Sequence, residues 1–176
     1  PGGNKIVKFQ ESGWPNSLLT MRFRFYHDQN VTDTPQDFQA MWVGTIPFNP
    51  DFDDNTAPIV FNVPDDATKV EFVSYITGHG WGSNGTYNCA EFCNSKHIFT
   101  VNGGVYEFDT SYPEAGDLDY CMEPATIVQG VKPNQYGTWG YGRAGWCPGQ
   151  DVHPMITDIT DYVAIGDDNV MQYTAC

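Results

Sequence analysis

The chain has 176 residues with 8 basic and 22 acidic side chains, which gives a formal charge of −14. This charge disfavours nucleic acid and anionic lipid surfaces as partners, because like charges repel. The length fits one domain over residues 1–176, and no apolar run approaches the roughly 20 residues that a membrane-spanning helix needs.

Aromatic residues make up 15% of the chain, and 18 glycines and 12 prolines supply many turns, a composition that favours strands over helices. In chain order, the expected strands cover residues 5–9, 21–27, 58–63, 70–77, 97–101, 104–108, 125–128, 156–163 and 170–174. A short helix is expected near residues 35–41, since Thr34 and Pro35 suit its first positions. These segments amount to eight or nine strands, and the pattern predicts an all-β fold, an eight-stranded antiparallel jelly-roll sandwich.

Two segments, residues 78–96 and 130–153, are long and rich in glycine and polar residues. Long loops in compact domains are usually functional or disordered. Both segments contain several aromatic residues, which argues against disorder. We therefore expect the functional residues in these two loops.

The cysteine content indicates an oxidising compartment, because five cysteines accompany few lysines. The sequence begins at Pro1 without a basic-then-apolar leader, as expected of a processed or trimmed secreted chain. Asn30 and Asn84 each begin an N-glycosylation sequon. We expect an extracellular protein in which Cys176 is the unpaired cysteine, either free or linked to another chain.

In the first loop, Cys89 and Cys93 flank Glu91, and two chemistries fit this spacing. A disulfide would close a very short loop and hold Glu91 in one direction, where a carboxylate suits acid–base work or anchoring of a ligand. Reduced, the two thiolates and His97 could bind zinc together with a fourth ligand. The oxidising compartment favours the disulfide.

The second loop carries the segment Arg143-Ala-Gly-Trp-Cys-Pro-Gly149, and Cys121 is the expected disulfide partner of Cys147. A planar guanidinium suits a carboxylate or sugar hydroxyls, and Trp139 and Trp146 offer flat faces on which sugar rings could stack. The alternative is structural, with Arg143 paired to a nearby Asp and the aromatic residues in the core.

Four segments in this order resemble the C-terminal lobe of the peptide-N-glycosidase F family: residues 78–82, 88–93, 97–103 and 143–149. That family has a Cys-Ala-Glu-Trp-Cys segment and an Arg-Ala-Gly-Trp-Cys-Pro-Gly segment at a comparable separation. The resemblance implies a jelly-roll lobe of an enzyme that cleaves the amide bond between an N-linked glycan and its asparagine. In that enzyme the active site lies between two such lobes.

The resemblance also implies roles for individual residues. Glu91 falls on the functional glutamate of the family, and Arg143 falls on an arginine that contacts chitobiose. Cys89–Cys93 and Cys121–Cys147 are the implied disulfides. The catalytic residues would thus be Glu91 and Arg143, with the substrate-binding residues His79, Trp81, Trp139 and Trp146.

The family's principal catalytic aspartate lies in an N-terminal lobe, whereas this chain has the length of one lobe. We therefore expect a glycan- or glycopeptide-recognising domain, in which Glu91 is a polar anchor or acid–base group and Arg143 a clamp. Amidase activity of the chain by itself is left open. A separate N-terminal lobe is an expected partner.

Metal binding is an alternative function. The lobe also resembles the domains of peptidylglycine-hydroxylating copper monooxygenases, and the copper ligands here would be His79, His97, His153 and Met155. No His-x-His pair occurs, and His97 alternates with apolar residues, which is more typical of a core histidine. Calcium could bind the acidic runs 51–55 and 167–169, although solvated acidic loops are more usual.

A third function is structural. The chain would be a glycosylated subunit of an extracellular assembly, with sugars on Asn30 or Asn84 and a covalent link through Cys176.

Overall fold

The computed structural model describes residues 35–80, 90–133 and 137–176. By its contacts the chain divides into two units, residues 1–38 and 39–176, and the fold below is that of the second unit. The expected strands at 5–9 and 21–27 and the candidates Asn30, Trp81, Asn84 and Cys89 lie outside the described residues. The single domain over residues 1–176 therefore stays a prediction.

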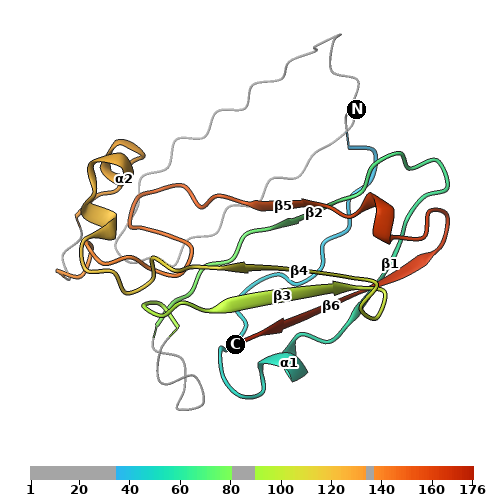
Figure 1. Cartoon of the computed structure of the whole chain (residues 1–176), viewed down its shortest axis with the longest axis horizontal. Coiled ribbons are helices and arrows are strands. Elements are labelled where there is room, and N and C mark those ends of the chain that lie inside the picture. Colours follow the sequence, from blue (N-terminus) through green and yellow to red (C-terminus); the bar gives the residue numbers. More distant parts are fainter. Residues whose placement is uncertain (1–34, 81–89, 134–136) are drawn as a thin grey trace, which may run out of the picture. The chain divides into compact units, whose positions relative to one another are not determined.

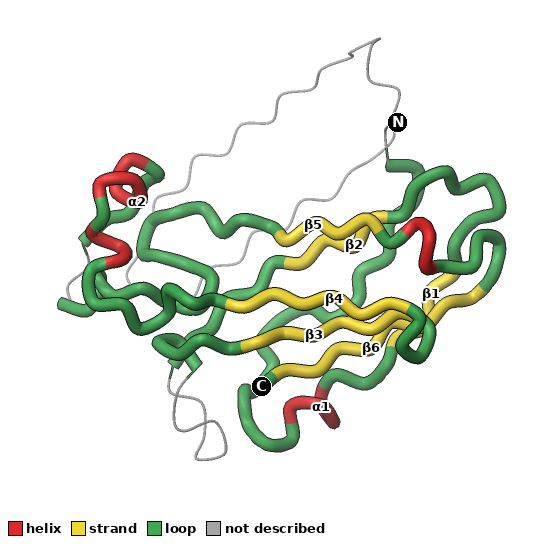
Figure 2. Tube along the Cα trace, in the orientation of Figure 1, coloured by secondary structure: helices red, strands yellow, loops and turns green. Residues whose placement is uncertain are grey.

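The described residues form an all-β fold, as predicted, with two antiparallel sheets (Figure 1). Six strands lie in this part of the chain: β1 (Ile59–Asn62), β2 (Glu71–Ser74), β3 (Lys96–Val101), β4 (Tyr106–Ser111), β5 (Met155–Asp158) and β6 (Asp168–Ala175). One sheet has the order β1-β6-β3-β4, and the other pairs β2 with β5. Figure 2 shows that the region around helix α2 (Pro124–Val128) consists largely of loops.

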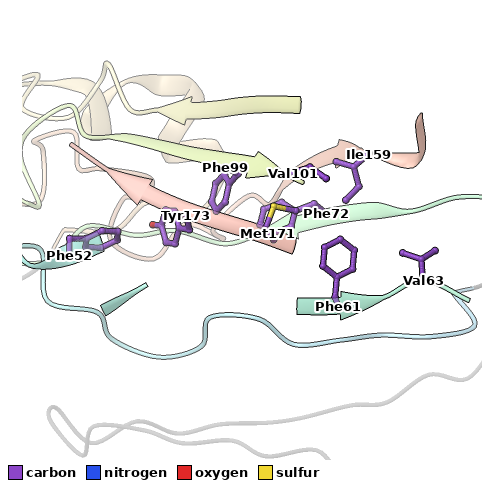
Figure 3. Packing of buried hydrophobic residues seen from close by; sticks show 9 residues of the cluster. All are labelled: Phe52, Phe61, Val63, Phe72, Phe99, Val101, Ile159, Met171 and Tyr173. Carbon is purple, nitrogen blue, oxygen red and sulfur yellow. The ribbon is translucent and has the colours of Figure 1, made fainter. Parts of the chain in front are cut away.

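The two sheets pack face to face through alternate side chains of their strands. On β6 the buried positions are Asn169, Met171 and Tyr173, and on β3 they include Phe99. Phe99 stacks on Tyr173 with ring centroids 4.6 Å apart, and its ring lies 4.7 Å from that of Phe72 on the opposite sheet. The buried apolar cluster drawn in Figure 3 comprises Phe52, Phe61, Val63, Phe72, Phe99, Val101, Ile159, Met171 and Tyr173.

The strand expected at residues 125–128 is wrong, because this segment is the helix α2. Pro124 occupies one of its first two positions, where a missing N–H costs nothing, and Thr126 turns its hydroxyl onto the Glu123 carbonyl oxygen at 2.8 Å. Thr126 is the only buried residue of the helix, so Ile127 and Val128 are not packed into a sheet in spite of their β-branched side chains. Local turn chemistry therefore decides the structure here.

The helix expected near residues 35–41 is also wrong, because those residues have no regular secondary structure. Tertiary contacts hold the neighbouring chain instead: Gln39 donates to the Val60 carbonyl oxygen, and the Trp42 indole donates to that of Ala57. Among the described residues the first helix is α1 (Phe52–Asn55), which buries Phe52 against Tyr173. Two short 3₁₀ helices also lie in this part of the chain, η2 (Tyr120–Met122) and η3 (Thr160–Tyr162), and η3 shortens the strand expected at 156–163 to β5.

His97 on β3 is a buried core histidine whose two ring nitrogens are both engaged. Nε2 lies 3.0 Å from the Ser95 hydroxyl, and Nδ1 lies 2.7 Å from the Tyr173 hydroxyl. Burial lowers the pKa of His97 to about 4, because the charged imidazolium is poorly solvated there.

No helix in the described part of the chain is long and apolar enough to cross a membrane.

Because the pKa of His97 is lowered, we expect the free energy of unfolding to decrease as the pH is lowered from about 6.5 to about 4. In this window the unfolded chain takes up a proton on His97 and the folded chain does not, so the free energy of unfolding rises with pH. A shift of this size corresponds to about 3 kcal/mol lost by pH 4. Urea denaturation across the window, with the wild type and a His97→Gln variant, measures it.

The pH slope is the readout, because losing the two hydrogen bonds also lowers the stability of His97→Gln at every pH. His153→Gln is the matched control, since His153 is exposed. Parallel profiles for the wild type and His97→Gln would contradict the prediction.

Candidate functional site

Glu91 and Arg143, from the two long loops, form a buried ion pair. Arg143 Nε donates to Glu91 Oε1 at 2.6 Å, and the two side chains are 2% and 18% exposed. A buried guanidinium requires such a partner, because removing its charge from water is costly. The pair joins residues that are separated by 52 positions, and it is a glutamate rather than a nearby Asp that meets Arg143.

The other guanidinium donors of Arg143 are taken by its own loop. Nη1 donates to the carbonyl oxygens of Tyr141 at 3.0 Å and Trp139 at 3.5 Å. Nη2 contacts the carbonyl oxygen of Thr138 at 2.9 Å and its hydroxyl at 3.3 Å. The five N–H groups of an arginine are therefore all directed at protein atoms.

Two aromatic rings complete the surroundings of Arg143. Its Cζ lies 4.8 Å from the ring centroid of Trp146 and 5.2 Å from that of Phe92, distances at which a cation is attracted to an aromatic face. The guanidinium therefore shapes the site by binding Glu91, the loop carbonyls and these rings.

Glu91 is held at both carboxylate oxygens and keeps part of its surface exposed. Oε2 accepts a hydrogen bond from the Gly80 backbone N–H at 3.1 Å, while Oε1 faces Arg143. The backbone is fixed as well, because Glu91 N donates to the Gly80 carbonyl and Ala144 N donates to the Glu91 carbonyl. A carboxylate oriented in this way is suited to accept hydrogen bonds from a ligand.

Trp146 and His79 form an aromatic pair beside this carboxylate. Their ring centroids are 4.7 Å apart, and the Trp146 indole N–H donates to the Gly78 carbonyl at 2.7 Å. His79 is exposed, and its Nε2 lies 2.9 Å from the Thr77 hydroxyl. Trp139, in contrast, packs against the buried cluster of Cys121, Val131 and Cys147.

Disulfides fix the second loop and exclude the zinc alternative at the first. Cys121 and Cys147 are bonded with their Cα atoms 5.7 Å apart, and both are buried. Cys93 is disulfide-bonded, so it is not a thiolate that could bind zinc; Cys89, its expected partner, lies outside the described residues. Cys176 is free and exposed.

Glycines permit the close approach of the loops, a feature that the motif analysis missed. A Cβ on Gly78 would lie 2.2 Å from the Ala90 carbonyl oxygen, and one on Gly145 would lie 2.3 Å from that of Ile76. Gly145 also has a φ of +79°, which L side chains rarely adopt. Gly145 is therefore a steric requirement of the site, and its place in the Arg143–Gly149 motif was the sequence signal for this close approach.

The described residues contain no cluster of side chains that supports the metal-binding alternatives. Within residues 35–80, 90–133 and 137–176, no three His, Cys, Asp or Glu side chains form a group that could hold a metal ion. His97 lies in the core, whereas His79 and His153 are exposed. Asn169, in one of the acidic runs, is buried and hydrogen-bonded to Ala164 and Asn102.

Comparison with known families identifies the class of this all-β domain. Residues 47–175 match the family model described as "Peptide-N-glycosidase F, C terminal". The chain therefore belongs to this family, which confirms the resemblance seen in the motifs. No curated protein matches the chain.

Solved structures of the same family show the fold. The chain is similar to PNGase F described as a glycosylasparaginase from Flavobacterium meningosepticum, and to a structure of peptide-N(4)-(N-acetyl-beta-D-glucosaminyl) asparagine amidase. Each is 22% identical with a TM-score of 0.50, over 74% of this chain and 42% and 43% of those chains respectively. The chain thus spans less than half the length of these structures.

Removing the charge of Arg143 is expected to destabilise the domain strongly. Arg143→Met leaves the Glu91 carboxylate largely buried without its cation, which costs about 3 kcal/mol or more. In the double variant Arg143→Met, Glu91→Gln, part of this loss should be recovered. Denaturant unfolding of the two single variants and the double variant gives the coupling energy.

Lys69→Met is the matched control, because Lys69 forms an ion pair with Glu71 in which the side chains are 53% and 43% exposed. Its effect should stay below about 1 kcal/mol. Equal losses for Arg143→Met and Lys69→Met would show that burial of the Glu91–Arg143 pair has no energetic consequence.

Proposed function

We propose that the chain is an extracellular domain, a jelly-roll lobe, that recognises the glycan of a glycopeptide through Glu91. Membership of the peptide-N-glycosidase F C-terminal family supports this proposal. The observation that carries it is the Glu91 carboxylate, which is held at both oxygens by Arg143 and Gly80, remains 18% exposed, and lies beside an aromatic pair. Sugar hydroxyls would donate to this carboxylate.

Arg143 acts in this proposal as a positioning residue rather than as a clamp on the sugar. Its guanidinium is 2% exposed, and its donors are directed at Glu91 and at the carbonyls of its own loop. Trp146 and His79 provide the stacking surface, because they lie next to each other and His79 is exposed. Trp139 supports the disulfide cluster instead, and Trp81 stays a predicted contact.

Recognition is proposed in preference to amidase activity by this chain alone. The related structures carry the names of an N-glycanase and of an asparagine amidase, and the chain spans 42% and 43% of their lengths. General acid–base catalysis needs a group placed at the scissile bond. The carboxylate of Glu91 is oriented by a guanidinium, an arrangement suited to a fixed hydrogen-bond acceptor for the ligand.

The test is binding of a chitobiosyl-asparagine peptide to the chain, measured by isothermal titration calorimetry. Glu91→Gln keeps the size of the side chain and removes its charge, so the dissociation constant should rise at least ~10-fold. Glu107→Gln is the matched control, because Glu107 is exposed on β4, and it should bind as the wild type does.

Release of ammonia and free glycan from a denatured glycoprotein, followed in the same samples, separates recognition from cleavage. Binding without release supports the recognition domain. Release that is lost in Glu91→Gln would replace it with an amidase, and absence of binding by the wild type would overturn the proposed ligand.

A further inference from the structure

A cavity borders the Trp146 ring. It has a volume of about 190 Å³, and it is open to solvent. Its lining residues are Tyr112, Glu114, Tyr120, Gln129, Gly145, Trp146, Gln150, Asp151 and His153. Glu91 and Arg143 are absent from this lining, so the cavity is separate from the Glu91 carboxylate although the two share Trp146.

The cavity is small for a sugar chain. Pockets for drug-sized ligands usually enclose ~300–1,000 Å³, whereas this one of about 190 Å³ has room for the end of one side chain. Three aromatic residues, Tyr112, Tyr120 and Trp146, supply its apolar walls.

Several hydrogen-bond donors around the cavity are already used within the protein. The Tyr112 hydroxyl donates to the Ile76 carbonyl oxygen at 3.2 Å, and Gln150 Nε2 donates to Gln129 Oε1 at 2.6 Å. Glu114 and Asp151 contribute only acceptors when ionised. An ammonium or guanidinium group only donates and therefore matches these two carboxylates, beside which Tyr120, Gln129 and His153 supply the further polar groups of the lining.

The charge of the lining points the same way, because it contains two carboxylates and neither lysine nor arginine. Burial, and next the Glu114 carboxylate, raise the pKa of Tyr112 to about 12. The same two causes, followed by Glu123, raise the pKa of Tyr120. Both phenols therefore sense the negative potential of Glu114 and stay protonated.

We propose that this cavity, bounded by Tyr112, Tyr120 and Trp146 and by the carboxylates of Glu114 and Asp151, binds the cationic end of a lysine or arginine side chain of a polypeptide ligand. The aromatic faces would hold the cation by cation–π attraction and pack on its methylenes, and the carboxylates would accept its hydrogen bonds. This binding goes beyond glycan recognition and does not depend on Glu91. Where the polypeptide also carries a glycan, Trp146 would lie between the two.

The test uses the ¹⁵N-labelled chain and two small probes of similar shape, Nα-acetyl-lysine methylamide and its neutral analogue Nα-acetyl-norleucine methylamide. The indole N–H of Trp146 is the reporter, because it borders the cavity and has a defined hydrogen bond to Gly78. The lysine probe should shift this resonance with saturation, and added salt should weaken binding. The norleucine probe should bind at least fivefold more weakly.

The double variant Glu114→Gln, Asp151→Asn should weaken lysine binding at least fivefold. Glu107→Gln, Asp54→Asn is the matched control, because it removes the same charge from exposed positions outside the lining, and it should leave binding unchanged. Equal binding of both probes, equal effects of the two double variants, or no response to the lysine probe would each overturn the proposal.

The glycan site is distinguished in the same samples. The double variant Glu114→Gln, Asp151→Asn should weaken lysine binding and leave binding of the chitobiosyl-asparagine peptide unchanged, because Glu91 and Arg143 are absent from the cavity lining. A wild-type chain that binds the glycopeptide but not the lysine probe overturns the cation site alone, and the converse result overturns glycan recognition alone. A chitobiose-induced Trp146 shift that is lost in Glu114→Gln, Asp151→Asn would make the cavity a sugar subsite and overturn this inference.

Discussion

The contact between Arg143 and Glu91 organises the candidate site of this domain. A guanidinium that is 2% exposed is unfavourable unless its charge and all its donors are compensated. One carboxylate supplies the countercharge, and the carbonyl oxygens of the neighbouring loop take the remaining donors. The same ion is therefore responsible for the direction of Glu91 and for the path of residues 138–141. The contacts that compensate the buried charge thus also fix the conformation of both loops.

The sheets bring these loops together. β2 ends at Ser74, and the chain reaches the Gly80 N–H that binds Glu91 six residues later. β3 begins at Lys96, five residues after Glu91. The Cys121–Cys147 disulfide closes the segment that contains Arg143, and a bridge of this separation contributes on the order of 3 kcal/mol in the chain-entropy model. Packing of Phe72 on Phe99 holds together the two sheets from which these loops depart.

The sequence predicted what depends on the type and spacing of side chains. The expected segments 97–101 and 170–174 correspond to the long strands β3 and β6, and the cysteine and arginine motifs indicated the family. It did not predict the partners of the Arg143 nitrogens, because carbonyl oxygens belong to every residue and carry no signature in sequence. The strand expected at 125–128 failed for a related reason: its β-branched residues suit a sheet, but Pro124 begins a helix and no neighbouring strand is present.

Trp146 contacts Arg143, the partner of Glu91, and also lines the cavity of Glu114 and Asp151, and these two carboxylate environments differ in their compensation. On one side the Glu91 carboxylate is neutralised by a full positive charge, so it can accept hydrogen bonds from a neutral group without demanding a cation. On the other, Glu114 and Asp151 line a cavity that contains neither lysine nor arginine. The charge of a ligand group would therefore decide whether it binds near Glu91 or in the cavity, since an aromatic surface suits sugars and cations alike. A polypeptide that carries both groups would satisfy the two environments together, and its two contacts would strengthen each other through their linkage.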